Sequence, residues 1–157
     1  MDGRKPWMRE NHGRAVEFFK VSRGMRQGFP LSPFLCVLQA SVLSILLDKR
    51  RQDQDLMGIR MARAVQDINH AQFADDTLLI GGASTLVATR FKKELDHYCE
   101  TSGSQVNLSK SHIYGWNINA REMLSITRIF GIQGTVNWLA IKYLGLPIFQ
   151  KFPRSAD

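Results

Sequence analysis

Two adjacent carboxylates, Asp75 and Asp76, interrupt an otherwise largely apolar run that ends at Ile80. A charged pair is costly to bury in such a run, so we expect it at a turn or bound to a ligand. Neighbouring carboxylates repel each other, and a divalent cation relieves the repulsion while gaining hard oxygen ligands. The pair is therefore a candidate site for Mg²⁺ or Mn²⁺. The alternative is a solvated Asp-Asp turn in an ordinary β-hairpin.

A second candidate site is the loop over residues 22–33, which is dense in turn-forming and charged residues. Within it, Arg26, Gln27 and Gly28 supply a cation, an amide and a glycine that permits close approach. They stand just before an expected helix N-terminus, where anions such as phosphates are commonly held. The simpler interpretation is that the loop only turns the chain and caps the helix.

The elements that must position the carboxylates are short strands. Residues 69–74 and 77–80 each have strand character, which places Asp75 and Asp76 at the tip of a β-hairpin. A further strand is predicted over residues 15–21, a short one over residues 56–59, and one over residues 112–116. Residues 138–149 are apolar and broken at Gly145 and Pro147, which predicts a tight hairpin.

A long apolar helix is predicted over residues 33–49, with Ser32 as N-cap and Pro33 in the first helical position. Its apolar residues spread so widely around the helix that we expect it to be buried on most sides.

Two more helices are indicated by capping residues. One begins at Ser84 or Thr85, runs to about residue 101 and stops at Gly103. Its charged residues are predicted to be solvated, namely Lys92, Lys93, Glu94, Asp96 and Glu100. The other begins at the capping-box-like pair Asn119 and Glu122 and stops at Gly131.

Length and charge limit the class of protein. A chain of 157 residues suggests one domain or a piece of a larger one. We expect a frayed basic tail over residues 1–12, a domain over 13–150 and a second tail over 151–157. The formal net charge of +7 favours a polyanionic partner.

The two cysteines, Cys36 and Cys99, lack metal-type spacing, so we expect reduced core thiols and an intracellular compartment. The longest apolar stretch, residues 34–47, is too short to span a bilayer, so no membrane partner is predicted.

Four segments together resemble the non-LTR (LINE-type) retrotransposon reverse transcriptases. Residues 23–33, RGMRQGFPLSP, are similar to that family's R-G-x-R-Q-G-x-P-L-S-P element, and residues 73–76, FADD, to its catalytic hairpin. Ser102-Gly103 with Asn107 and Lys110-Ser111 is similar to its S-G and N-x-x-K-S segment. Residues 143–147, YLGLP, resemble the Y-L-G-x-P turn of plant members. The four stand in the family's order.

The resemblance implies an α+β fold, part of a reverse-transcriptase palm, with antiparallel strands packed on two or three helices. It implies RNA-directed DNA polymerase activity by two-metal nucleotidyl transfer. The implied partners are an RNA template, a DNA primer and deoxynucleotide triphosphates. The implied compartment is the nucleus. The oligomeric state is left open.

The resemblance also assigns roles to single residues. Asp75 and Asp76 correspond to metal-binding catalytic aspartates, and Lys110 to a lysine that donates a proton to pyrophosphate. For Lys110, a solvated surface charge is an equal alternative. The residues that would lie against the incoming nucleotide are Arg26, Gln27, Gly28 and Pro30. Those that would support the primer strand are Tyr143, Leu144 and Gly145.

Three departures from the family weigh against activity of this polypeptide alone. Nothing before Arg23 resembles the family's F-x-x-D segment, which carries a further catalytic aspartate. We also expect the family's fingers and thumb to be missing from this polypeptide. Phe29 stands at a position that is often acidic in the family. We therefore expect an inactive palm segment. The alternatives are a non-catalytic, basic, nucleic-acid-binding remnant and a decayed retroelement copy.

Overall fold

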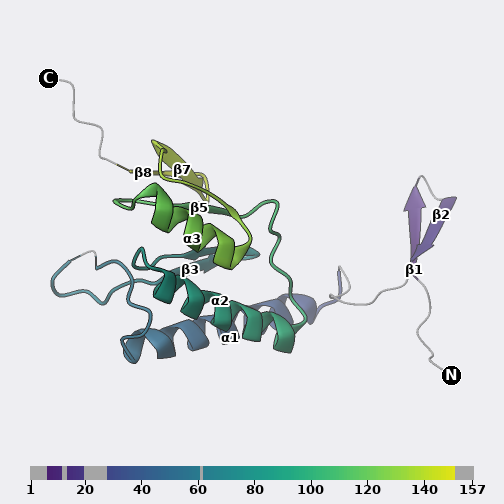
Figure 1. Cartoon of the computed structure of the whole chain (residues 1–157). Coiled ribbons are helices and arrows are strands. Elements are labelled where there is room, and N and C mark those ends of the chain that lie inside the picture. Colours follow the sequence, from purple (N-terminus) through teal and green to yellow (C-terminus); the bar gives the residue numbers. More distant parts are fainter. Residues whose placement is uncertain (1–6, 12–13, 20–27, 61, 151–157) are drawn as a thin grey trace, which may run out of the picture.

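The computed structural model describes residues 7–11, 14–19, 28–60 and 62–150 (Figure 1). Within these ranges the chain forms three helices: α1 (Ser32–Gln52), α2 (Thr85–Ser102) and α3 (Ala120–Phe130). It also forms eight short strands: β1 (Trp7–Asn11), β2 (Arg14–Phe19), β3 (His70–Phe73), β4 (Asp76–Leu79), β5 (His112–Tyr114), β6 (Gln133–Thr135), β7 (Ala140–Tyr143) and β8 (Leu146–Phe149).

The strands pair as four two-stranded sheets within the described part of the chain. Three of them, β1–β2, β3–β4 and β7–β8, are antiparallel hairpins. The predicted α+β class with antiparallel strands and three helices is confirmed. The described strands do not, however, join into one continuous sheet.

The pair β5–β6 is parallel, which the sequence did not predict. Strands that pair in parallel need a crossover connection, and α3 supplies it. The sequence did not predict β6, because this strand is only three residues long and has Gly134, a poor strand former, at its centre. A side chain at Gly134 would collide with Met123 and Thr127 of α3, so this glycine allows the helix to pack closely on the strand.

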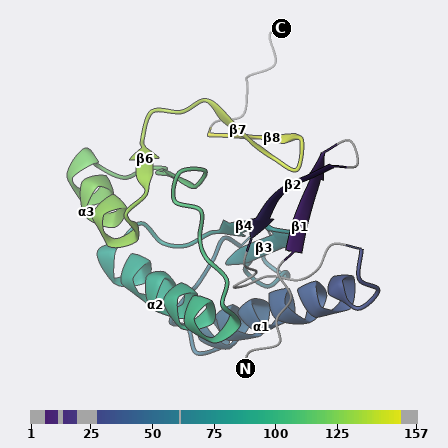
Figure 2. The same ribbon diagram turned by 90° about the vertical axis from the view of Figure 1, so that its right-hand side faces the viewer.

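The core lies where α1 and α2 cross and pack against each other (Figures 1 and 2). Leu43 and Leu47 of α1, Leu56 from the loop after α1, and Phe91 of α2 form one buried cluster. Leu79 of β4 packs against this cluster, which attaches the β3–β4 hairpin to the helices. The hairpin that carries the candidate carboxylates is therefore seated on the core.

Local signals fixed the ends of α2 and α3 as predicted. The Ser84 side chain accepts a hydrogen bond from the Val87 amide at 3.2 Å, and Gly103 ends α2 in the left-handed conformation. Asn119 Oδ1 accepts from the Glu122 amide at 2.9 Å, and α3 stops at Gly131.

The predicted N-cap of α1 is wrong by one residue. The cap is Leu31, Ser32 is already helical, and the cap makes no side-chain hydrogen bond. The chain is turning before the helix begins, because the Ser32 amide donates to the Phe29 carbonyl at 3.0 Å. Leu31 already has helical dihedral angles, so Ser32 falls inside the helix.

The prediction that α1 is buried on most sides is also wrong. Leu43 and Leu47 are buried, but Phe34 is 73% exposed and Ile45 is 66% exposed. Cys36 is exposed as well, so it is not the core thiol that the sequence suggested. In the described part of the chain, α1 packs on α2 and on β3 along one side only, and its other apolar residues face away from them.

By length and composition, α1 is the one described helix that meets the requirements for crossing a membrane. It has 21 residues and a mean hydropathy of 1.3. The helix is therefore longer than the apolar stretch over residues 34–47, from which no membrane span was predicted. This is weak support for a membrane location, because apolar core helices of soluble proteins meet the same criteria.

The predicted frayed tail is wrong for Trp7–Asn11. These residues form β1 and pair with β2, with an irregularity in the register between Arg9 and Glu10. The predicted strand over residues 15–21 corresponds to β2, whose described part ends at Phe19. The predicted strand at residues 56–59 is reduced to a single bridge between Ile59 and Ile68.

Candidate functional site

The two candidate carboxylates lie at the end of the β3–β4 hairpin. Phe73 pairs with Asp76, so the turn consists of Ala74 and Asp75, and Asp76 is the first residue of β4. The predicted tip is therefore displaced by one residue. Of the two turn residues only Ala74 has positive φ, at +52°, which is the pattern of a type II′ turn.

Both carboxylates are exposed to solvent. Side chains alternate between the two faces of a hairpin, so Asp76 lies on the face opposite Gln72 and Leu79. Gln72 and Leu79 contact α1 and the core. Asp76 therefore points away from α1, and Asp75 projects from the turn, where both are open to a ligand.

Asn69 anchors the base of this hairpin to the end of α1. It is 1% exposed, and its amide nitrogen donates to the carbonyls of Leu47 at 3.1 Å and Leu56 at 2.9 Å. Its own backbone carbonyl accepts from the Ile80 amide at 2.8 Å. Sequence reasoning placed Asn69 only at the start of a strand, and nothing local marks it as an anchor.

A second anchor lies one turn earlier along α1. The Ser44 hydroxyl donates to Gln72 Oε1 at 2.6 Å, on the face of the hairpin that packs on the helix. Nothing local in the sequence marks Ser44 as an anchor. Both anchors connect to β3, so the position of the carboxylates depends on α1.

His70 stands beside Asn69 in β3, with Nδ1 2.7 Å from Asn69 Oδ1. Because the Asn69 nitrogen donates to two carbonyls, its oxygen must accept, and His70 Nδ1 carries the hydrogen. Burial lowers the pKa of His70 below its ordinary value, Asp48 partly opposes this, and Arg51 adds to it.

The predicted primer-contacting residues lie in the β7–β8 hairpin. Leu144 and Gly145 form its exposed two-residue turn, with φ of +52° and +81°, the pattern of a type I′ turn. Tyr143 is half-buried, and its hydroxyl donates to the Ala71 carbonyl of β3 at 3.2 Å. The structure thus joins this hairpin to the one that carries Asp75.

The remaining predicted site residues are not joined to the carboxylates. Lys110 is exposed in a turn closed by Asn107, and none of the described hydrogen bonds or ion pairs connects it to Asp75 or Asp76. Gly28 and Pro30 are exposed in the turn before α1, and Gly28 has φ of +79°. Arg26 and Gln27 lie outside the described residues.

The donor chemistry of the carboxylate pair fits a hard divalent cation, but the number of ligands does not. Mg²⁺ prefers six oxygens in a near-octahedral arrangement. Asp75 and Asp76 have no third described His, Cys, Asp or Glu in position to complete a cluster. Within the described chain, the pair can supply only part of a site.

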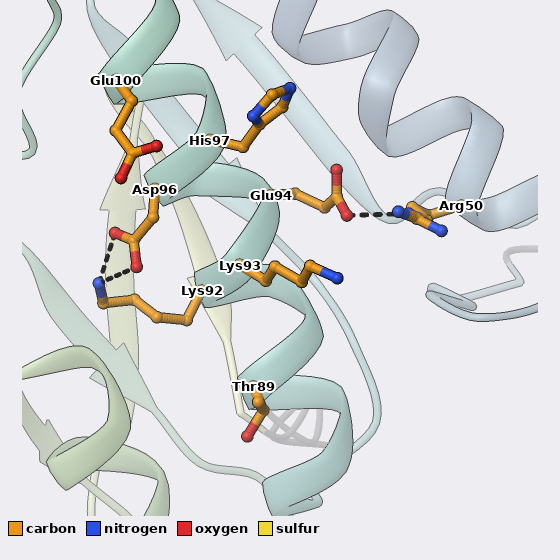
Figure 3. Close-up of a pocket in the computed structure, with 8 residues that line it drawn as sticks. All are labelled: Arg50, Thr89, Lys92, Lys93, Glu94, Asp96, His97 and Glu100. Atoms are coloured by element: carbon orange, nitrogen blue, oxygen red, sulfur yellow. Dashed lines mark hydrogen bonds and ion pairs between the residues drawn. The ribbon is translucent and has the colours of Figure 1, made fainter.

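A shallow depression elsewhere runs along α2 near the end of α1 (Figure 3). It is lined by Arg50, Thr89, Lys92, Lys93, Glu94, Asp96, His97 and Glu100. Glu94 is 5% exposed and bonds Arg50 Nε at 2.8 Å, so the prediction that Glu94 is solvated is wrong. Lys92 pairs with Asp96. The Arg50–Glu94 pair joins α1 to α2, and the Lys92–Asp96 pair lies within α2, so four of the charged residues that line the depression have partners in the protein itself.

A mixed α+β fold that presents adjacent carboxylates at a hairpin turn is compatible with part of a polymerase palm. The sequence matches the reverse transcriptase (RNA-dependent DNA polymerase) family over residues 4–148, and the chain therefore belongs to this family.

An uncharacterised mitochondrial protein of Arabidopsis thaliana is 50% identical to the chain over 56 residues. The matched segment covers 36% of this chain and 46% of the length of that relative.

Proposed function

We propose that the chain is the palm segment of an RNA-directed DNA polymerase from a non-LTR (LINE-type) retrotransposon of the plant type. The observation that carries the proposal is the exposed Asp75-Asp76 pair at the hairpin turn, within a chain of the reverse transcriptase family. The order of the RGMRQG, FADD, N-x-x-K-S and YLGLP motifs supports the LINE subtype. A relative from a plant supports the plant type.

In this proposal Asp75 and Asp76 hold Mg²⁺ or Mn²⁺. The bound ion would supply electrostatic stabilisation of phosphoryl oxygens during nucleotidyl transfer. Lys110 would donate a proton near the triphosphate, and its exposed position in a turn leaves the ammonium group accessible. The nucleotide would lie against Gln27 and Gly28, with Arg26 and Pro30 shaping that surface.

The proposed partners are an RNA template, a DNA primer and deoxynucleotide triphosphates. A net charge of +7 favours phosphate contacts, which release counterions from nucleic acid.

We infer an intracellular compartment, which is supported by the two free cysteines, Cys36 and Cys99. The resemblance to retrotransposon enzymes suggests the nucleus, whereas the Arabidopsis relative is mitochondrial.

Metal binding tests the proposed role of the hairpin. Mn²⁺ titration followed by electron paramagnetic resonance should give weak binding, because two carboxylates make an incomplete site. Asp75→Asn should weaken it several-fold. Asp96→Asn is the matched control, since Asp96 is exposed on α2 and pairs with Lys92. Tight binding to the wild type, or equal binding to Asp75→Asn, would contradict the assignment.

Primer extension on an RNA template tests the activity. The 157-residue polypeptide alone should be inert, because the described carboxylates do not complete a two-metal site. Fusion of a family-type fingers and F-x-x-D segment before Arg14, and of a thumb after Phe149, should restore activity that Asp75→Asn abolishes. If the folded fusion stays inert, Phe29→Asp tests whether the aromatic residue is the defect. Asp75-dependent extension by the polypeptide alone would refute its expected inactivity.

A further inference from the structure

The β3–β4 hairpin is held from two directions. Asn69 and Gln72 tie it to α1. From β7–β8, a single described hydrogen bond reaches it, donated by the Tyr143 hydroxyl to the Ala71 carbonyl at 3.2 Å. The two residues are 72 positions apart in the sequence, so this bond joins segments that no local interaction would bring together.

The Ala71 carbonyl, which accepts this hydrogen bond, belongs to the same hairpin as the carboxylates. Ala71 pairs with Leu78, and the next pair but one, Phe73 with Asp76, closes the turn that contains Asp75. A hairpin of four residues per strand is marginally stable alone, so its position depends on its external contacts. Movement at Ala71 is therefore transmitted to Asp75 and Asp76.

Tyr143, which donates this hydrogen bond, lies next to the turn of the β7–β8 hairpin. Tyr143 pairs with Leu146 and immediately precedes the turn residues Leu144 and Gly145. Because this turn has only two residues, Tyr143 fixes its position. The Tyr143 hydroxyl is engaged in the hydrogen bond to Ala71. Leu144 is 47% exposed, so its side chain is open to a ligand.

We propose that Tyr143 is a positioning residue whose hydroxyl couples the turn of β7–β8 to the carboxylate hairpin. This inference rests on the proposed function, in which the two turns serve the primer strand and the metal. It gives Tyr143 a role different from direct primer contact: a primer that displaces the Leu144-Gly145 turn shifts Ala71 and, with it, Asp75.

Tyr143→Phe tests the coupling, since it removes one oxygen and keeps the ring. A neutral hydrogen bond of this kind corresponds to roughly 2- to 10-fold in an opening equilibrium. Hydrogen–deuterium exchange of the β3–β4 amides should accelerate by about that factor, while exchange in α2 stays unchanged. Tyr114→Phe is the control, because the Tyr114 ring packs on Trp138 and none of the described hydrogen bonds uses its hydroxyl.

Mn²⁺ affinity provides the readout that a purely structural bond would not move. In folded Tyr143→Phe, Asp75-dependent Mn²⁺ binding should weaken about 2- to 10-fold, and Tyr114→Phe should match the wild type. Faster exchange throughout the protein, unchanged exchange in the hairpin, or unchanged Mn²⁺ affinity would each overturn the proposal. If the wild type shows no Asp75-dependent Mn²⁺ binding, the proposed function fails, and hairpin-selective exchange alone then decides whether Tyr143 couples the two turns.

Discussion

His70 connects the acid–base behaviour of the protein to the anchor of the hairpin. Its imidazole is half-buried beside Asn69, with Asp48 and Arg51 as the charged groups that act on it. Desolvation is the largest influence and lowers the pKa of His70 in the folded chain. The attraction of Asp48 is smaller, so the folded state disfavours the imidazolium relative to the unfolded state.

We expect stability to fall in acid because of His70. An unfolded histidine titrates near pH 6.5, about its ordinary value. The folded pKa is lower, so the unfolded chain binds more protons as the pH falls below 6.5. The contribution of neutral His70 is therefore present above that pH and is lost as the pH falls toward the folded pKa.

Urea unfolding at mildly alkaline and mildly acidic pH measures this effect. His70→Gln should flatten the pH dependence of the free energy of unfolding. An unchanged slope in His70→Gln would show that other groups account for the acid sensitivity.

The contact between α1 and α2 includes an ion pair between buried Glu94 and partly exposed Arg50. Glu94 accepts from Arg50 Nε at 2.8 Å, and Arg50 also lies 3.7 Å from Asp55 Oδ2. Arg90 binds the other Asp55 oxygen at 3.2 Å. These ion pairs connect the end of α1 and the loop that follows it to α2.

Glu94→Gln should destabilise the protein, because it leaves the Arg50 guanidinium without a buried counter-charge. Breaking a fully buried pair costs about 3–5 kcal/mol. The side chain of Arg50 is 37% exposed, so solvent screening reduces the expected loss to about 1–2 kcal/mol. Chemical denaturation measures it, with Glu100→Gln on the exposed face of α2 as the control. Equal losses in both variants would refute a specific role for the pair.

The described surface carries a large amount of exposed apolar area. Along α1, Phe34, Val37, Leu38 and Ile45 are each more than 60% exposed, and Leu139 and Leu146 are exposed near β7–β8. Exposed apolar side chains favour association, as do the open edges of two-stranded sheets. These exposed apolar side chains form a surface that a larger assembly or a second copy of the chain would bury.

We expect the isolated 157-residue chain to self-associate as its concentration rises. Sedimentation velocity over a concentration series should show the sedimentation coefficient increasing. The double variant Phe34→Lys, Ile45→Lys should remain monomeric at higher concentration with an unchanged melting temperature, because both side chains are exposed. Leu43→Ala, in the buried cluster, should instead lower the melting temperature. Identical association of the wild type and the double variant would exclude the α1 surface as its cause.

The sequence alone determined the features that depend on neighbours along the chain. Ser84 and Asn119 start their helices, and Gly103 and Gly131 end them, because capping joins residues only a few positions apart. The hairpins around Asp75 and Gly145 were predictable for the same reason, with an error of one residue at the first. The family, too, could be inferred from the motifs before any geometry was known.

The tertiary structure decided which side chains meet. Only the packing of α1 on α2 separates buried Leu47 from exposed Phe34, since both are apolar residues of one helix. The charge of Glu94 predicted a solvated residue, yet Arg50, 44 positions away, makes its burial possible. The bond from Tyr143 to Ala71 likewise has no local signature, because contacts between distant segments depend on the packing of whole elements.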